Sequence, residues 1–146
     1  MVIDTSTSSN GLNIHNMKAD NFEDLGIYQK SCALVDRIYE LTGVQPWVSD
    51  YRFVQQIRAA SGSVSDNIAE GFERQGNKEF INFLYIAKGS CGEVRSQISR
   101  AYRVGFISKE AYDALYSDCK ILSAAILRFI KALKNAAVPG SRYATP

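Results

Sequence analysis

The stretch FINFLYIAKGSCGEVRSQISRA, residues 80–101, places apolar side chains at alternating steps of four and three residues. This spacing keeps them on one face of an α-helix, whereas a β-strand would need steps of two. We therefore predict a long amphipathic helix in this stretch. Its buried stripe consists of Phe80, Leu84, Ala87, Cys91, Val94, Ile98 and Ala101.

Three further stripes with helical spacing flank this one. The clearest lies towards the C-terminus and comprises Tyr112, Leu115, Cys119, Leu122, Ile126, Phe129 and Leu133. Two weaker stripes precede residue 80. The first comprises Leu25, Tyr28, Cys32, Val35 and Tyr39. The second comprises Phe53, Ile57, Ala60, Val64 and Ile68. The four stripes predict four helices and an all-α fold.

Turn-forming residues fall between the stripes, at residues 43–46, at Gly76 and at Gly105. The candidate N-caps of the helices that follow are Ser49, Asn77 and Ser108. Because short connections force consecutive helices to lie antiparallel, we predict an up-down-up-down four-helix bundle. A second apolar seam fits either a wide core or an interface between subunits, and includes Ile27, Leu34, Ile38, Leu41, Phe83, Ile86, Ile121, Ala125 and Ile130.

Composition divides the chain into three parts. Residues 1–20 are rich in Ser, Thr, Asn and Gly, and residues 138–146 contain a Pro-Gly pair. We expect a mobile polar leader and a flexible tail, because neither segment can bury enough apolar surface to offset its ordering entropy. Residues 21–137 are expected to form the bundle domain, since a chain of 146 residues can build one sizeable core.

Charge, cysteine content and the N-terminal sequence bear on the compartment. The 17 Lys and Arg against 15 Asp and Glu give a net charge of only +2, so any basic surface must be local. Three widely spaced cysteines without a C-x-x-C pair predict buried, reduced thiols. The sequence has no signal-peptide pattern and no apolar run of membrane-spanning length. We expect a cytoplasmic protein that does not bind membranes.

The residue types that usually carry catalysis are scarce. His15 is the only histidine and lies in the leader, so neither a nucleophile with a histidine base nor a usual zinc site can be assembled. No phosphate-binding glycine loop or nucleophile elbow is present. We expect the carboxylates Glu70, Glu73, Glu79 and Glu93 to be solvated. We predict a protein that is not an enzyme, with no catalytic residues, metal or cofactor.

Small residues interrupt the predicted third helix. Gly89, Ser90 and Gly92 lie inside it, where each glycine costs about 1 kcal/mol relative to alanine. Such residues favour a close helix crossing, within or between subunits, or a ligand lying against the backbone. Residues 59–63, AASGS, form a matching stretch in the second helix, and we expect the two stretches to face each other.

The local charge distribution favours nucleic acid. No acidic residue lies between Arg95 and Lys109, or after Asp118, and phosphate groups bind clustered cations. A basic helix end is also what the helix macrodipole favours, so the same residues have a structural explanation. The candidate nucleic-acid-binding residues are Arg95, Arg100, Arg103, Lys109, Lys120, Arg128, Lys131 and Lys134.

A family resemblance centres on the pentapeptide Asn67, Ile68, Ala69, Glu70 and Gly71. With its flanks over about residues 22–135, it resembles the four-helix-bundle proteins encoded in intervening sequences of bacterial 23S rRNA genes. The resemblance implies an antiparallel bundle that assembles into a cyclic homo-oligomer, a pentamer, without known catalytic activity. More distant relatives are accessory proteins of diversity-generating retroelements, where a basic oligomeric barrel contacts nucleic acid and the enzyme.

The pentapeptide also has a structural interpretation, which we favour over a binding role. Asn67 and Glu70 share a helix face and could hydrogen-bond each other or a neighbouring helix end. Gly71 would allow close packing or begin to terminate the helix.

The sequence supports two functional hypotheses, and a third, an enzyme with an unrecognised carboxylate site, ranks last because titratable residues suited to catalysis are so few. The first is a non-enzymatic oligomer that binds RNA, or a nucleic-acid-processing protein, through the candidate cations. The alternative is a protein-interaction scaffold or accessory subunit whose groove accepts a partner's helix, without contact to nucleic acid.

Overall fold

The computed structural model describes residues 19–136, and these residues form four α-helices and two short 3-10 turns without a strand. The predicted all-α fold with four helices is therefore confirmed. Nearly all of the predicted leader and tail, His15 included, lies outside the described residues. The elements are η2 (Phe22–Asp24), α1 (Gly26–Thr42), η3 (Trp47–Ser49), α2 (Tyr51–Glu73), α3 (Asn77–Arg103) and α4 (Lys109–Asn135).

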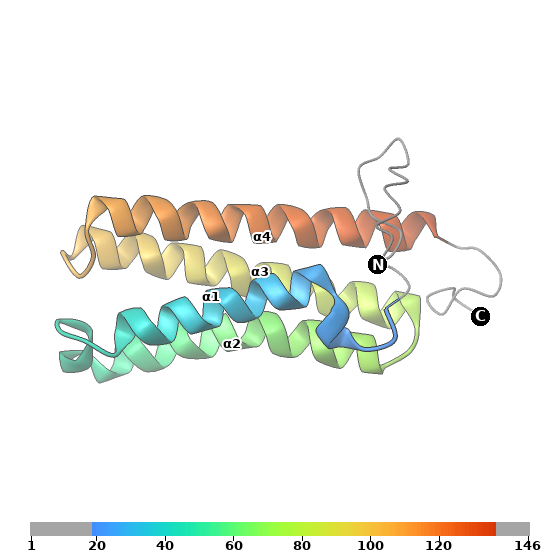
Figure 1. Ribbon diagram of the computed structural model, residues 1–146, viewed down its shortest axis with the longest axis horizontal. Helices are drawn as coiled ribbons and strands as arrows, with labels where there is room; N and C mark the ends of the chain where they lie inside the picture. Colours follow the sequence, from blue (N-terminus) through green and yellow to red (C-terminus); the bar gives the residue numbers. More distant parts are fainter. Residues whose placement is uncertain (1–18, 137–146) are drawn as a thin grey trace, which may run out of the picture.

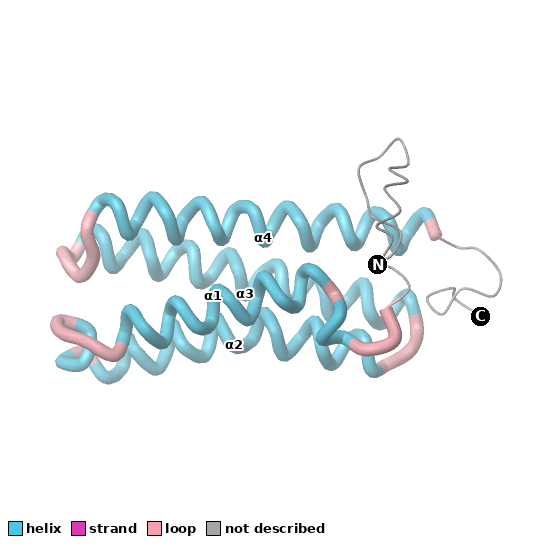
Figure 2. The backbone as a smooth tube through the Cα atoms, viewed as in Figure 1, coloured by secondary structure: helices cyan, strands magenta, loops and turns pink. Residues whose placement is uncertain are grey.

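The four helices lie side by side along one long axis (Figures 1 and 2). The α1–α2 and α3–α4 connections are at one end of the bundle, and the α2–α3 connection is at the other (Figure 1). Extensive packing joins α1 to α2, α2 to α3 and α3 to α4, whereas α1 packs much less against α4. The seam between α1 and α4 is therefore the loosest of the neighbouring pairs.

The core forms along the stripes predicted for the last three helices. Every member of the α3 stripe is at most 1% exposed, and every member of the α2 stripe is buried. The α4 stripe is buried as well, except for Tyr112, which is half-buried. Alternating steps of three and four residues thus located three of the four buried faces.

Of the stripe predicted for the first helix, only Leu25, which lies just before α1, is fully buried, and the buried face predicted for α1 itself is wrong. Tyr28, Cys32 and Val35 are only half-buried and Tyr39 is 50% exposed. Helix α1 carries apolar residues on two adjacent seams, and packing against its neighbours selects the other one. The residues of α1 that face the core are Ile27, Ser31, Leu34, Ile38 and Thr42.

The polar members of this α1 face are satisfied by local hydrogen bonds. Ser31 donates to the carbonyl of Tyr28 at 2.6 Å, and Thr42 donates to the carbonyl of Ile38 at 2.7 Å. The Thr42 hydroxyl also accepts from Nε of Arg58 in α2 at 2.8 Å. Because these groups are paired, their burial does not carry the cost of an unsatisfied polar group.

Two of the three predicted N-caps are wrong. Helix α2 is capped by Asp50, whose carboxylate accepts from the backbone N–H of Phe53 at 3.0 Å, and Ser49 lies just outside the helix. Helix α3 has Gly76 at its N-cap position, and Asn77 is its first residue. Only α4 begins as predicted.

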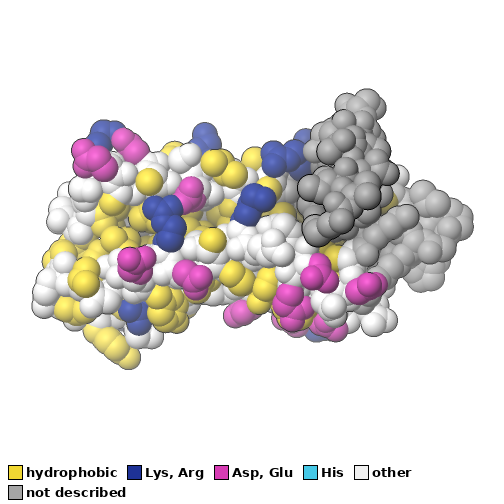
Figure 3. Space-filling model, in the orientation of Figure 1, with side chains coloured by type: hydrophobic (Ala, Val, Ile, Leu, Met, Phe, Trp, Pro, Cys, Tyr) yellow, Lys and Arg dark blue, Asp and Glu magenta, His cyan; other side chains and the backbone are white. Residues whose placement is uncertain are grey.

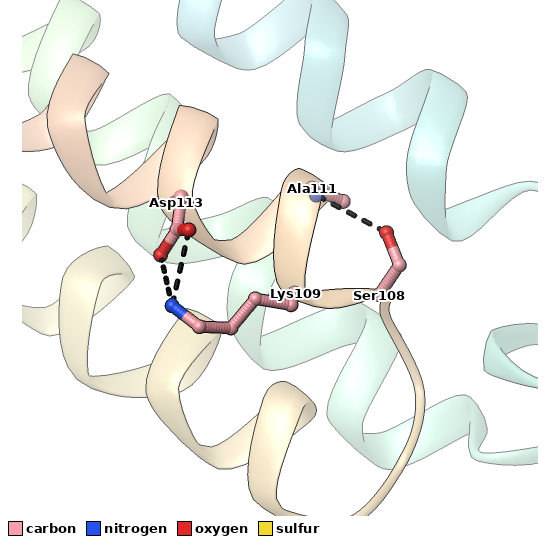
Figure 4. A network of polar contacts seen from close by, with 4 residues as sticks. All are labelled: Ser108, Lys109, Ala111 and Asp113. Carbon is pink, nitrogen blue, oxygen red and sulfur yellow. Dashed lines mark hydrogen bonds and ion pairs between the residues drawn. The ribbon is translucent and has the colours of Figure 1, made fainter.

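Helices α3 and α4 form a helical hairpin. The N-cap of α4 stabilises the end with the α3–α4 connection, and the buried first residue of α3 stabilises the opposite end. Oγ of Ser108 accepts a hydrogen bond from the backbone N–H of Ala111 at 3.1 Å (Figure 4). The side chain of Asn77 is buried and donates to the carbonyl of Leu133 at 3.2 Å. The start of α3 is thereby tied to the last turns of α4.

The second apolar seam contributes mainly to a wide core. Ile27, Leu34 and Ile38 of α1 are buried, as are Ala125 and Ile130 of α4. Only Ile86 and Ile121 from this seam stay largely exposed, at 52% and 53%.

Candidate nucleic-acid interface

The two halves of the described chain differ in the sign of their charge. Residues 77–136, which contain α3 and α4, carry ten Lys and Arg against five Asp and Glu. Residues 19–76, which contain α1 and α2, carry five Lys and Arg against nine Asp and Glu. In Figure 3 most Lys and Arg lie over the half of the surface formed by α4, and most Asp and Glu lie over the opposite half.

Four of the candidate cations run along α4. Lys109, Lys120 and Lys131 are eleven residues apart, which is close to three helical turns, so they lie nearly on one line along the helix. Lys134 follows Lys131 by about one turn. Its ammonium donates to the hydroxyl of Tyr85 in α3 at 2.9 Å and lies 5.2 Å from the centroid of that ring. This line of lysines therefore borders α3.

Two of the α3 cations face the same side. The guanidinium of Arg95 lies 5.6 Å from the ring centroid of Tyr116 in α4. Arg103, the last residue of α3, follows Tyr85 by eighteen residues, or five full turns, and so lies on the side where Tyr85 meets Lys134. We call the surface shared by α3 and α4 the basic face, and its cations are Arg95, Arg103, Lys109, Lys120, Lys131 and Lys134.

The structure places the other two candidates on the flanks of the basic face. The guanidinium of Arg100 lies 5.4 Å from the ring centroid of Phe53 in α2, so Arg100 belongs to the α2–α3 side. Arg128 follows Ile121 by seven residues and shares its side of α4, which borders α1.

Most cations of the basic face are available to a ligand. Within residues 19–136, neither Arg103 nor Lys120 nor Lys131 takes part in an ion pair, and all three are exposed. Lys109 is the exception, because its ammonium donates to both carboxylate oxygens of Asp113, at 2.9 and 3.0 Å (Figure 4). These hydrogen bonds raise the pKa of Lys109 above its ordinary value.

The interpretation of the sequence missed the tyrosines of this face. Tyr102 of α3 stacks on Tyr112 of α4, with ring centroids 4.8 Å apart and 22° between the planes. Tyr112 in turn contacts Tyr116, at 5.4 Å and 39°. Two spacings in the sequence could have indicated this arrangement. Arg95 and Tyr102 are seven residues apart and share one face of α3, and Tyr112 and Tyr116 are four apart and share one face of α4.

The pentapeptide lies where α2 packs against α3. The Asn67 amide donates to the carbonyl of Ser63 at 2.7 Å and to its hydroxyl at 3.0 Å, and that hydroxyl is 2.8 Å from Oγ of Ser90. Glu70 accepts from Arg74 instead. Of the two alternatives for Asn67 and Glu70, a hydrogen bond between them is therefore wrong. Of the two small-residue stretches that were expected to face each other, the structure brings Ser63 and Ser90 together.

Gly71 is the glycine that close packing requires. A Cβ built there would lie 2.6 Å from Cβ of Phe83 and 2.9 Å from Cδ2 of Phe80. Gly89 and Gly92 have nothing within 4 Å of such an atom, so a tight crossing at these two glycines within the subunit is wrong. The pentapeptide thus joins α2 to α3, with Ile68 fully buried in the core.

The thiols are shielded from solvent, apart from Cys32, which is half-buried rather than buried as predicted. The Cys91 thiol donates to the carbonyl of Cys119 at 3.2 Å. A hydrogen bond with the Cys91 side chain and burial raise the pKa of the Cys119 thiol above its ordinary value. A thiol that stays protonated is a poor nucleophile and metal ligand. Within residues 19–136 no three His, Cys, Asp or Glu side chains gather as a metal site would require.

Two grooves flank the basic face. One, of about 230 Å³, lies between α1 and α4 and is lined by Ala33, Leu34, Ile121 and Leu122, with Arg37 and Asp118 forming an ion pair across it. The other, of about 470 Å³, lies between α2 and α3 and is more polar. Its lining includes Ser63, Glu93, Gln97 and Arg100.

None of the helices in the described part of the chain is long and apolar enough to cross a membrane.

The fold and its basic face define a small four-helix bundle with one positively charged side. The model of the 23S rRNA-intervening sequence protein family matches residues 23–128, and the chain belongs to this family. The resemblance drawn from the sequence is thereby confirmed.

The fold is shared with solved structures. One of them is a protein of unknown function from the S23 ribosomal protein family of Bacteroides thetaiotaomicron VPI-5482, with 24% sequence identity and a TM-score of 0.67. The match covers 72% of this chain and 95% of that one. No curated protein matches the chain.

Proposed function

We propose that this chain is a non-enzymatic, oligomeric helical module that binds RNA, or a ribonucleoprotein, through the basic face of α3 and α4. The observation that carries the proposal is the charge difference between the halves of the bundle, since residues 77–136 hold twice as many cations as anions. Three exposed cations without an ion pair within residues 19–136, Arg103, Lys120 and Lys131, can each displace a counterion from a phosphate.

Self-association would repeat this face around a symmetric assembly. We take the bundle to be antiparallel and the assembly to be cyclic, a pentamer as the family resemblance implies. Ile121 lies on the α1 side of the basic face, and Ile86, seven residues before the groove-lining Glu93, lies on the α2 side. A heterologous contact that buries Ile121 of one copy near Ile86 of the next closes a ring and leaves every basic face exposed.

The chemistry of the described residues supports a role without catalysis. Cys91 and Cys119 are buried, and the carboxylates of Glu70, Glu73 and Glu93 are on the surface.

The test is binding of the purified full chain to a fluorescent structured rRNA fragment across a salt series, with the mass of the protein measured in the same buffer. The proposal expects an oligomer whose affinity falls steeply with salt. Absent or salt-independent binding by an assembled oligomer would overturn the RNA-binding part, and a monomer would overturn the ring.

The α1–α4 groove favours a second candidate, a scaffold that binds a partner's helix. Its lining by Leu34, Ile121 and Leu122 suits the apolar side of an amphipathic helix. Such binding would depend weakly on salt, whereas binding of RNA through the basic face would weaken steeply as salt rises.

A further inference from the structure

We propose that the contacting tyrosines Tyr102, Tyr112 and Tyr116 form a platform on which unpaired RNA bases stack, beside cations that hold the adjoining phosphates. This inference rests on the proposed function and specifies the class of RNA as single-stranded segments, loops or ends. It stands on the geometry of the three rings, on their position at the surface, and on the cations around them.

The rings form a continuous series that joins the two helices of the basic face. Tyr102 and Tyr112 are nearly parallel, with 22° between their planes, as in an offset stack. Tyr116 extends the series one turn further along α4. Tyr102 is the ring at the end of the series and is 38% exposed, so part of it is accessible to a further planar group.

Of these three tyrosines, Tyr112 packs against the core, whereas Tyr102 and Tyr116 are not part of it. A separate aromatic cluster lies between α2 and the α3–α4 turn, where Trp47 meets Phe53 at 4.9 Å and Phe106 at 5.3 Å. Phe53 and Phe106 complete the triangle at 5.9 Å. Trp47, Phe53 and Phe106 thus pack on one another at this end of the bundle. The tyrosine series lies apart from them and is only partly buried, which favours a ligand for it.

Cations surround the stack in the arrangement that single-stranded nucleic acid requires. The guanidinium of Arg95 lies 5.6 Å from the centroid of Tyr116. The ammonium of Lys109 lies 5.9 Å from the centroid of Tyr112 and is paired with Asp113, so it is less available to a phosphate than Arg95. Arg103 is adjacent to Tyr102 in the chain and is exposed. Aromatic rings that stack bases, next to cations that neutralise the backbone, are the common means of binding single strands.

The rings also determine which form of RNA fits. Bases inside an A-form duplex already stack on each other and present only their edges, 2′-hydroxyls and phosphates to a protein. An unpaired base has a free face and can stack on Tyr102. A duplex could use only the cations of the basic face, so the tyrosines favour unpaired segments.

The test measures binding of the full chain to a labelled oligo(A) strand and to the same strand paired with oligo(U). The variant Tyr102→Leu removes the ring and keeps an apolar side chain, whereas Tyr102→Phe keeps the ring. Tyr51→Leu serves as the matched control, since Tyr51 is exposed at the start of α2 and lies on the other half of the bundle. Thermal unfolding of each variant establishes that it is folded.

We expect Tyr102→Leu to weaken binding of oligo(A) about tenfold, in line with the loss of one base–aromatic stack. Binding of the duplex and the slope of affinity against salt should not change, and Tyr102→Phe and Tyr51→Leu should stay within about twofold. Equal affinities of Tyr102→Leu and wild type for oligo(A), with steep salt dependence in both, would overturn this inference alone. A wild-type chain that binds neither RNA at low salt would overturn the proposed function with it.

Discussion

The hairpin of α3 and α4 and the hairpin of α1 and α2 bury apolar faces of the same kind, yet their surfaces carry opposite net charge. Ile98 in the first and Ile38 in the second are both fully buried. Outside the core, the first hairpin has an excess of five positive charges and the second, with its flanking turns, an excess of four negative charges.

This difference is informative because the fold does not require it. Amphipathic helices need a polar outer face, but the sign of its charge is free to vary. Net charge affects association and non-specific binding far more than it affects the choice of fold. The asymmetry is therefore better explained by what the two surfaces meet than by how the chain folds.

The largest predicted effect tests whether the two hairpins contribute equally to the shared core. Ile98→Ala and Ile38→Ala should each lower the free energy of unfolding by about 2–5 kcal/mol, because both leave a cavity in a fully buried site. Chemical denaturation measures both. Tyr39→Ala is the control and should change stability much less, since Tyr39 is largely exposed. A loss at Tyr39 as large as that at Ile38 would mean that α1 buries the face predicted from its sequence.

A second prediction concerns the contact that joins the two hairpins. Gly71→Ala should cost about 1–3 kcal/mol, because the added Cβ would overlap Phe83 and force α2 and α3 apart. Gly62→Ala, in the same helix with open space around it, should instead be neutral or stabilising by up to about 1 kcal/mol. Thermal unfolding of the two variants compares them directly. Equal losses at both positions would contradict the packing assigned to Gly71.

The smallest predicted effect concerns the loose seam between α1 and α4. Asp118→Asn removes the ion pair with Arg37. Both side chains are more than 40% exposed, so solvent screens the pair and its loss should cost less than about 1 kcal/mol. Denaturation at low and high salt should show the difference fading as salt rises. A loss above about 2 kcal/mol that persists in high salt would mean that this seam is as tightly packed as the others.

The sequence predicted helices α2, α3 and α4 with their buried faces, because each has one dominant apolar stripe. It failed for α1, where two seams compete and only the neighbours of the helix decide between them. It also failed at Ser49 and Asn77. The N-caps are the neighbouring residues Asp50 and Gly76, and the backbone conformation that decides between neighbours is not visible in the sequence.

The candidate site was predicted in part. Charge runs identified the six cations assigned to the basic face, but did not separate them from Arg100 and Arg128, which the helix packing moves to its flanks. The tyrosine stack was missed because Tyr102 and Tyr112 meet only after the chain reverses between α3 and α4.

The central claim is that the half of the bundle formed by α3 and α4 contacts RNA. The most direct test compares two triple variants, each losing three exposed cations, in the salt dependence of binding to the structured rRNA fragment. One replaces Arg103, Lys120 and Lys131 with Gln, and the other replaces Lys30, Arg52 and Arg74. We predict that the first triple lowers the slope of log affinity against log salt by about two to three, and that the second leaves it unchanged. Equal slopes in both variants, or a larger change in the second, would contradict the claim.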